Sequence, residues 1–302
     1  MANARTSIVK ELEPGLNKVF GETYNGFDDE AQPLYAQETS DRSFEEEVIF
    51  SGFGAAPNKS EGDAVVYDDA TELWVARYSH TTVALAFAIT EEAMEDNLYE
   101  KLSVRLTKSL ARSMAHTKQV KGAATFNNAQ DSSYVGGDGV VLLSTAHPLR
   151  GGATLANRPS SGVDLSETAL EDAMINVAGW TDDRGIPIAV QLRKLAIPVN
   201  LVFTAERLLK SQFQPDAVTN NVNAIVTTGM LPDGYVVNHR FTDTDAWFIL
   251  TDQPDGLKQF TRVAYATGME GDFETGNMRY KARERYCFGW SDWRGIYGSM
   301  GG

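Results

Sequence analysis

The sequence predicts an α+β fold in which a protruding β-hairpin, one long helix, an α/β segment and a returning β segment follow one another. Residues 47–89 place two strand-like flanks around the turn-rich "APNKSEGD", which is the pattern of a hairpin. Residues 90–121 repeat apolar side chains at helical spacing. The alternating helical and strand-like runs that follow indicate an α/β unit. A length of 302 residues is enough to bury a substantial core.

The composition excludes several classes of protein. The net charge is −14, and an acidic chain without an obvious Lys/Arg cluster argues against a nucleic-acid-binding protein. No apolar run approaches the roughly 20 residues of a membrane span. The N-terminus lacks the apolar core of a signal peptide, so we expect a soluble intracellular product. One cysteine, Cys287, and four scattered histidines predict no disulfide, no metal site and no cofactor.

Residues 1–46 are polar and only weakly periodic, which predicts an extended arm. Their apolar side chains, among them Leu16, Phe20 and Tyr24, are too numerous for a solvated tail. We therefore expect the arm to lie on another surface.

Residues 90–121 form the clearest helical pattern in the sequence. Thr90 suits the N-cap position, and Gly122 is expected to end the helix. The apolar side chains fall at every fourth position: Met94, Leu98, Leu102, Leu106, Leu110 and Met114. Because a spacing of four drifts on a helix with 3.6 residues per turn, this stripe winds round the helix and suits several neighbours.

Residues 122–261 predict a mixture of loops, helices and strands. A strand at Val140–Leu143 lies among loops, Ser166 caps a helix that ends near Gly185, and Thr204 caps a shorter helix. The strand-like runs are "IPIAV", "LAIPVNLVF", "NAIVTT", "GYVVNHRF" and "AWFILTD". From Met278 onward aromatic and charged residues alternate, as they do in strands with one buried face.

The stretch "LLSTAHPLRGG" places Ser144 three residues before His147, which raises the question of a nucleophile with its base. Such a serine needs a base within hydrogen-bond reach and a third group that orients the base. The G-x-S-x-G elbow is missing, Pro148 favours an extended backbone at His147, and the sequence shows no orienting acid. We interpret the stretch as a strand end bonded to a turn, with no catalytic residue; a serine hydrolase is the alternative.

The order of these elements resembles the tailed-phage major capsid proteins of the Hong Kong phage fold. Several segments are similar to the Mu-like prophage major head subunits: "LLSTAHPLRGGATLANRPS", "LSETALEDAM", "DRGIPIAVQLRKLAIPVNLVFTAERLLKS", "DTDAWFILTD" and "ARERYCFGWSDWRGIYGS". The resemblance implies an N-terminal arm at 1–46 and an extended loop at 47–89 that reaches a neighbouring subunit. It also implies a peripheral domain made of 90–121, which holds the spine helix, and 262–302. Residues 122–261 would form the axial domain.

The resemblance implies a structural protein, not an enzyme, that self-assembles through hexamers and pentamers into an icosahedral shell. The shell would enclose double-stranded DNA without specific binding, in a virion assembled in the host cytoplasm. Scaffold, portal and cement proteins are its implied partners, and no membrane is involved. Six residues are candidate contacts between subunits: Lys59, Trp74, Arg77, Trp290, Trp293 and Arg294.

Two further interpretations stay open. Some members of the fold join subunits through a lysine–asparagine isopeptide bond, and Lys59 at the hairpin tip is placed for one; a solvated tip lysine is the alternative. The same fold also serves encapsulin-like nanocompartments, which hold a cargo enzyme in place of a genome.

Overall fold

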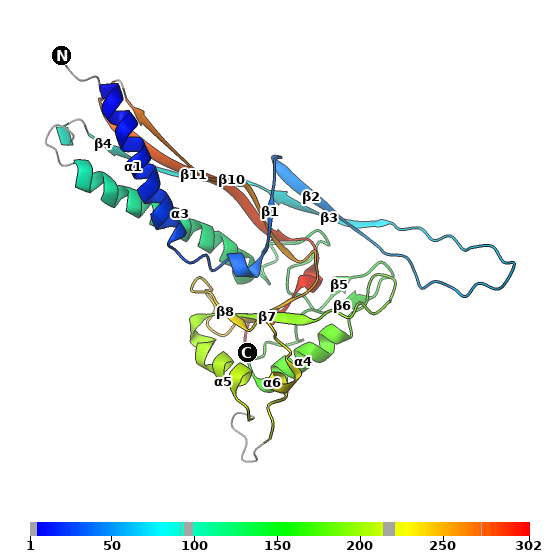
Figure 1. The fold of residues 1–302 in the computed structure, drawn as a ribbon. Coiled ribbons are helices and arrows are strands. Elements are labelled where there is room, and N and C mark those ends of the chain that lie inside the picture. The colour runs from blue at the N-terminus through cyan, green and yellow to red at the C-terminus, as the bar shows by residue number, and fades with distance from the viewer. Residues whose placement is uncertain (1–4, 91, 94–98, 214–220, 273) are drawn as a thin grey trace.

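The computed structural model of the chain describes residues 5–90, 92–93, 99–213, 221–272 and 274–302. It has a mixed α+β architecture built on two four-stranded sheets, with a long hairpin projecting away from both (Figure 1). The first sheet has the order β1-β10-β11-β4 and the second the order β12-β9-β7-β8. Among the described residues, no helix is both long and apolar enough to cross a membrane.

The first sheet is long and mostly antiparallel. Its strands are β1 (Ala36–Thr39), β4 (Thr81–Ile89), β10 (Leu257–Gly271) and β11 (Met278–Trp290). Strand β11 pairs antiparallel with both β10 and β4, whereas the short β1 runs parallel to β10. Alternate residues of β11 are buried from Met278 to Glu284, which confirms the strand with one buried face expected there.

Helix α1 (Arg5–Asn25) replaces the extended arm expected at the N-terminus. The extended conformation is wrong for these residues because Leu16, Phe20 and Tyr24 are spaced four apart and share one helix face. Leu16 and Phe20 are buried against α3 and β11. The expectation that the segment lies on another surface is therefore confirmed, within the same chain.

Helix α3 (Tyr99–Asn127) is the long helix expected from the apolar spacing. Gly122 does not end it, and the helix continues for five more residues. A Cβ on Gly122 would lie 2.6 Å from the Cβ of Ala31, so this glycine permits close approach of the segment that follows α1. Leu110 and Met114 are buried, whereas Leu102 is 40% exposed, as a stripe that winds round the helix requires. Met94 and Leu98 lie outside the described residues.

The hairpin consists of β2 (Phe44–Phe50) and β3 (Glu72–Ser79), which pair antiparallel. Residues 51–71 between them have no regular secondary structure beyond a turn at the tip. The hairpin is shorter than the predicted 47–89, because the chain leaves it after Ser79 and enters the first sheet as β4. In Figure 1 the hairpin points away from the far end of the first sheet.

The second sheet and its helices form the other part of the molecule. The strands are β7 (Leu192–Ile197), β8 (Tyr235–Val237), β9 (Trp247–Thr251) and β12 (Ile296–Ser299). The helices are α4 (Glu167–Ala178), α5 (Val202–Lys210) and α6 (Ala224–Thr228), with short 3-10 turns at Gln32–Leu34, Val199–Leu201 and Trp293–Gly295. A two-stranded ribbon of β5 (His147–Pro148) and β6 (Thr154–Leu155) lies beside them. Their apolar faces enclose the largest buried cluster.

Several local predictions in this part are wrong. Residues 140–143 are not a strand, since only an isolated bridge joins Val135 and Val141. The run "NAIVTT" is helix α6, because the Asn223 side chain accepts hydrogen bonds from two helix N–H groups and Gly229 ends the helix in the left-handed conformation. The run "IPIAV" is not a strand either, since it contains only an isolated β-bridge between Pro187 and Thr181. Ser166 caps α4 as expected, accepting from the N–H of Ala169, although α4 ends at Ala178 and not near Gly185. Thr204 lies inside α5.

The chain end crosses from the first sheet to the second. Strand β12 pairs with β9, so the last strand does not extend the sheet that contains β11. Strand β10 in turn begins at Leu257, before the boundary expected at 262. The two sheets therefore share the C-terminal quarter of the chain.

Candidate assembly surfaces

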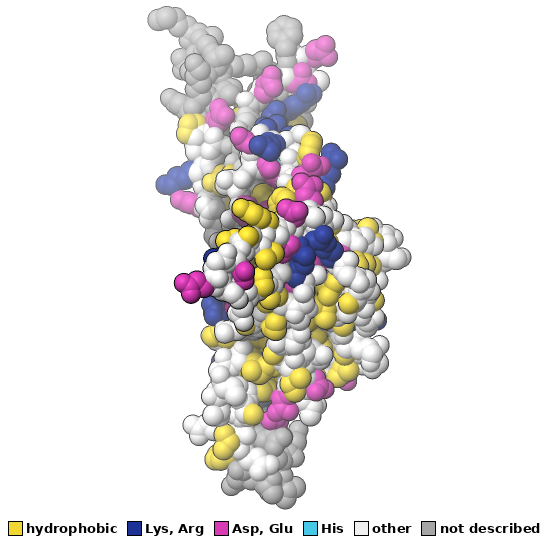
Figure 2. Space-filling model, turned by 90° about the vertical axis from the view of Figure 1, so that its right-hand side faces the viewer, with side chains coloured by type: hydrophobic (Ala, Val, Ile, Leu, Met, Phe, Trp, Pro, Cys, Tyr) yellow, Lys and Arg dark blue, Asp and Glu magenta, His cyan; other side chains and the backbone are white. Residues whose placement is uncertain are grey.

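The distal part of the hairpin carries apolar side chains that the described part of the same subunit leaves largely exposed. Phe50 is 58% exposed, Phe53 62% and Tyr67 94%, and Val65 and Val66 are similarly open. Seen from the side toward which the hairpin points, hydrophobic side chains spread over the middle of the surface, and charged ones of both signs mix above them (Figure 2). Exposed apolar groups on a projecting segment are typical of an interaction surface. Lys59 lies in this segment and is exposed.

The shaft of the hairpin, meaning residues 51–54 and 68–71 next to β2 and β3, is hydrogen-bonded to the part of the molecule that contains the second sheet. Arg150 donates to the Ser51 hydroxyl over 3.1 Å, and Arg184 donates to the carbonyl of Asp69 over 2.7 Å. Across the shaft, the Gly54 N–H donates to the Asp68 carboxylate over 2.7 Å. The pKa of Asp68 is lowered chiefly by that bond and by a second one from the N–H of Asp69. These contacts fix the direction of the shaft but leave the tip free.

The root of the hairpin is held by a buried lysine. Lys258 on β10 lies 2.6 Å from Glu47 on β2, 3.1 Å from Asp255 and 3.4 Å from Glu38 on β1. Glu47 also accepts from the Ser291 hydroxyl at the end of β11. Burial lowers the pKa of Lys258, but the hydrogen bonds that its ammonium donates to Glu47 and Asp255 outweigh burial, and the net pKa is raised. The ammonium group therefore stays charged and joins three strands.

Two of the six predicted contact residues lie on the hairpin near this root. The Trp74 ring N–H donates to the carbonyl of Ser291 over 3.2 Å, and the ring covers Gly137, where a Cβ would come within 2.8 Å of it. Arg77 has a side chain that is 58% exposed and lies 3.8 Å from Glu46. Its guanidinium stacks 4.2 Å from the Phe44 ring centre. Trp74 therefore makes most of its contacts inside the subunit, whereas the Arg77 side chain is accessible to a neighbouring subunit.

The three C-terminal candidates lie further inside. Trp290 is half-buried and packs on Gly136. Trp293 is 1% exposed and Arg294 is 3% exposed. Arg294 lies 3.3 Å from Asp292 and 3.7 Å from Asp183, and burial raises the pKa of Asp183 despite that arginine. Trp293 and Arg294 make their contacts inside one subunit and offer no surface to a neighbour in this conformation.

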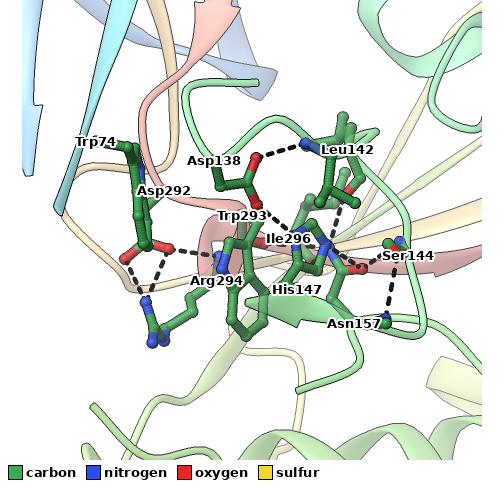
Figure 3. Close-up of polar contacts among 12 residues, drawn as sticks. Trp74, Asp138, Leu142, Ser144, His147, Asn157, Asp292, Trp293, Arg294 and Ile296 are labelled. Atoms are coloured by element: carbon green, nitrogen blue, oxygen red, sulfur yellow. Dashed lines mark hydrogen bonds and ion pairs between the residues drawn. The ribbon is translucent and has the colours of Figure 1, made fainter. Parts of the chain in front are cut away.

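His147 lies at the centre of a buried polar cluster (Figure 3). Its Nδ1 is 2.7 Å from the Asp138 carboxylate and its Nε2 is 3.2 Å from the side-chain oxygen of Asn157. The ring stacks on Trp293 with the ring centres 4.4 Å apart. The absence of an orienting acid inferred from the sequence is therefore wrong, because Asp138 in the "GGDG" turn supplies one.

This cluster does not assemble a serine nucleophile. The Asn157 NH₂ donates to the carbonyls of Leu142, Trp293 and Ile296, so its oxygen must face Ser144 N–H and His147 Nε2. Both imidazole nitrogens therefore face side-chain oxygens, one of Asp138 and one of Asn157. The Ser144 hydroxyl accepts from the N–H of Ala146. Both ring nitrogens of His147 are thus engaged by Asp138 and Asn157 and not by the Ser144 hydroxyl. The cluster joins the 136–139 turn, β5 and the C-terminal segment.

The sequence profile of the family described as "Phage capsid protein" matches residues 74–299, from the second hairpin strand to the last strand of the fold. The chain belongs to this phage capsid protein family. It is therefore a structural protein, a major capsid protein of a phage head. No curated protein matches the chain.

Solved structures resemble this capsid protein in fold at low sequence identity. A virus-like particle from Pyrococcus furiosus gives a TM-score of 0.52 at 10% identity, covering 94% of this chain and 97% of that one. The capsid of an empty GTA particle gives 0.53 at 10% identity, covering 89% and 88%. The procapsid of bacteriophage JBD30 gives 0.50 at 13% identity, covering 98% and 76%. The fold is thus the tailed-phage capsid fold that the order of elements predicts.

The residues that organise this capsid protein differ in part from those predicted. Asn157, Asp138 and Lys258 were missed, because each acts through partners distant in sequence. A signal existed for Asp138, since "GGDG" ends only eight residues before His147. Asn157 and Lys258 carry no local pattern that separates them from ordinary loop and strand residues.

Proposed function

We propose that many copies of the chain assemble into an icosahedral shell that encloses the double-stranded DNA of a tailed phage. The observation that carries the proposal is the hairpin: a long projection with exposed Phe50, Phe53 and Tyr67 cannot bury its apolar surface inside its own subunit. In a shell, the hairpin of each copy would reach a neighbour. The net charge of −14 would keep packaged DNA from adhering to the wall.

The division of the chain follows the same proposal. Residues 1–46 would serve as the arm, 47–89 as the extended loop, 122–261 as the axial domain around the capsomer centre, and 90–121 with 262–302 as the peripheral domain. Because β12 pairs with β9, the proposal assigns the final strand to the axial part. Lys59 and Arg77 are the accessible candidates for contacts between subunits, and Lys59 is the candidate for a covalent bond.

Finer assignments belong to the same proposal. The five segments similar to Mu-like prophage head subunits support a place in that group. Scaffold, portal and cement proteins would be partners, and assembly would take place in the host cytoplasm. We also propose that the protein has no catalytic activity, since His147 and Asn157 are engaged with each other. A Ser144→Ala variant that assembles like the wild type would support this, whereas a hydrolase would lose activity.

An encapsulin-like shell is the second candidate, and the fold likeness to the virus-like particle from Pyrococcus furiosus favours it. The contents of purified particles separate the two: genome-length nucleic acid supports the phage head, and a bound protein supports a nanocompartment.

Electron microscopy and sedimentation of the expressed protein test shell assembly directly. Limited trypsinolysis adds a local readout, because Lys59 is the only lysine or arginine between Arg42 and Arg77. We expect cleavage after Lys59 in dissociated subunits and protection in shells. A chain that stays monomeric, with Lys59 equally accessible in all fractions, would overturn the proposal.

A further inference from the structure

The exposed face of α3 carries a row of basic side chains. Arg105, Lys108 and Arg112 follow one another at steps of three and four residues, which places them on one face of a helix. All three are exposed, and the exposed Ser109 and Ser113 lie beside them on the same face. We call these five residues the basic stripe.

The opposite face of α3 holds the helix on the body of the subunit. Leu110, Ala111 and Met114 are buried in a cluster that also contains Leu16 and Phe20 of α1 and residues of β11. In Figure 1, α3 lies along the first sheet and α1 crosses it. The elements that pack on α3 therefore leave the basic stripe open.

Positive charge is concentrated on this helix. It contains six of the 27 Lys and Arg residues of the chain but only one of the 41 Asp and Glu residues. Lys118 pairs with Asp29 over 2.8 Å. Within the described part of the chain, no ion pair joins the cations of the basic stripe to an acidic group. In a chain with a net charge of −14, such a row of cations on an open helix face indicates an anionic partner.

The make-up of the stripe favours phosphate over a protein as that partner. From Arg105 to His116, every exposed side chain of α3 is charged or polar. A protein interface depends on apolar and aromatic anchors at its centre, and this part of α3 exposes none. A phosphate backbone needs only cations and hydrogen-bond donors, and arginine forms paired hydrogen bonds with phosphate oxygens.

The spacing of the cations suits an anion that repeats. At a rise of about 1.5 Å per residue, Arg105 and Arg112 are roughly 10 Å apart along the helix axis, with Lys108 between them. Duplex DNA carries one negative charge for about every 1.7 Å of its length. A backbone that runs along α3 therefore presents phosphates to all three cations at once.

We propose that the basic stripe binds the phosphate backbone of nucleic acid without regard to sequence, an inference that rests on the proposed function of enclosing DNA. The three cations neutralise phosphates, and the hydroxyls of Ser109 and Ser113 donate hydrogen bonds to phosphate oxygens. Outside α3 the chain is acidic, so the contact is confined to one line in each subunit. Each contact is weak by itself, and a shell of many copies holds the adjacent DNA by their combined effect.

Binding of a DNA duplex by the dissociated full-length subunit tests the inference. The probe is a short fluorescent duplex, titrated by anisotropy between about 50 and 200 mM salt. We expect the logarithm of the binding constant to fall against the logarithm of the salt concentration with a slope of about −2.7, since each of three cations contributes about −0.9. A duplex of unrelated sequence should bind equally.

Removing the three charges should abolish this dependence. Arg105→Gln, Lys108→Gln and Arg112→Gln together should bring the slope close to zero and weaken binding at low salt by about tenfold or more. Glutamine favours helix nearly as well as arginine and lysine, so the melting temperature should stay unchanged. Arg105→Lys with Arg112→Lys keeps the charges and should keep the slope.

The matched control removes the same charge at separate places. Lys18→Gln, Lys59→Gln and Arg207→Gln change three exposed cations on α1, the hairpin and α5, and this variant should bind the duplex like the wild type. Polyglutamate is the second probe, because it offers carboxylates in place of phosphates. It should bind the wild type more weakly than the duplex does.

Four outcomes would overturn the inference. The glutamine variant of the stripe could keep the wild-type slope, or the matched control could lose binding equally. Polyglutamate could bind as tightly as the duplex, which would assign the stripe to an acidic protein. Binding could instead be lost with Lys281→Gln and Arg283→Gln, two exposed residues of β11, which would place the site on that strand.

Shell assembly is measured separately, so that the two proposals can fail independently. Duplex binding that depends on the stripe, in a chain that forms no shells, would support this inference and refute the proposed assembly. Shells formed by a chain whose subunits do not bind the duplex would refute this inference alone.

Discussion

Replacing Lys258 by methionine should loosen the root of the hairpin. The substitution keeps the length of the side chain and removes the charge that joins Glu47, Asp255 and Glu38. Glu47 would keep its bond from Ser291 but would lose its cation. The half-buried carboxylate of Glu47 would then be only partly compensated, and leaving one partner of such a pair without its counter-charge is costly.

The magnitude follows from the exposure of the four side chains. Lys258 and Glu47 are 7% and 22% exposed, and a hydrogen bond between charged groups at such a site contributes about 2 kcal/mol. Asp255 and Glu38 are 50% and 40% exposed, so together they add about 1 kcal/mol. A total of about 3 kcal/mol lowers the melting temperature of a chain of this size by roughly 6 °C.

Thermal unfolding and hydrogen exchange measure the two consequences. Calorimetry should show the fall in melting temperature, and the amides of β2 and β3 should exchange faster than those of β9. Lys194→Met is the matched control, because the one hydrogen bond that Lys194 donates among the described residues goes to the carbonyl of Pro33, over 3.0 Å at an exposed site. If both variants melt alike and β2 exchange is unchanged, Lys258 does not hold the hairpin. A double variant with Glu47→Gln should lose less than the sum of the single losses.

Three further predictions concern the body of the subunit. Gly122→Val should prevent the segment around Ala31 from seating on α3, since even a Cβ would lie 2.6 Å from the Ala31 Cβ; we expect a melting temperature several degrees lower, and no change would contradict the close approach. Asn157→Ala should cost about 3 kcal/mol in denaturant unfolding, because buried carbonyls and the His147 Nε2 lose their partner; a loss under about 1 kcal/mol would mean that water replaces the amide. Glu284→Gln should stabilise the protein near neutral pH: burial raises the pKa of Glu284 above its unfolded value, so the folded carboxylate carries a penalty that grows as pH rises through its folded pKa. The gain should vanish in acid, and a gain independent of pH would refute this cause.

The long elements of the fold could be predicted from the sequence because their signals are local. The turn-rich stretch around Lys59 marked the hairpin, and the regular spacing that includes Leu110 and Met114 marked α3. The alternation after Met278 marked β11. In each case the pattern that determines the element lies within the element itself.

The failures share a physical cause, which is that the deciding contact lies elsewhere in the chain. Helix α1 forms on apolar residues spaced four apart, and it is buried by α3, which the sequence of α1 does not reveal. Gly122 is of the residue type that ends helices, but the structure gives another reason for a glycine there: a Cβ would lie 2.6 Å from the Cβ of Ala31. "NAIVTT" has the β-branched residues of a strand, yet the cap from Asn223 and the left-handed Gly229 make it a helix.

The residues of the candidate surfaces could be predicted only in part: Lys59 and Arg77 are exposed, whereas Trp293 and Arg294 are buried. Aromatic residues near the C-terminus were expected to meet a neighbour, yet Trp293 is enclosed by His147 and Trp180. Residue type alone does not distinguish an internal anchor from an interface anchor. The distinction depends on which sheet the chain end joins, and β12 joins the second.

Strand β11 shows how positive charge can be concentrated in a chain with a net charge of −14. In "MRYKARERYC" the basic residues alternate with buried ones, so no run of like charges stands out in the sequence. Strand geometry moves Arg279, Lys281 and Arg283 to one face at intervals of about 7 Å. Because this concentration depends on the strand and on which of its faces is buried, a count of charges along the sequence does not reveal it.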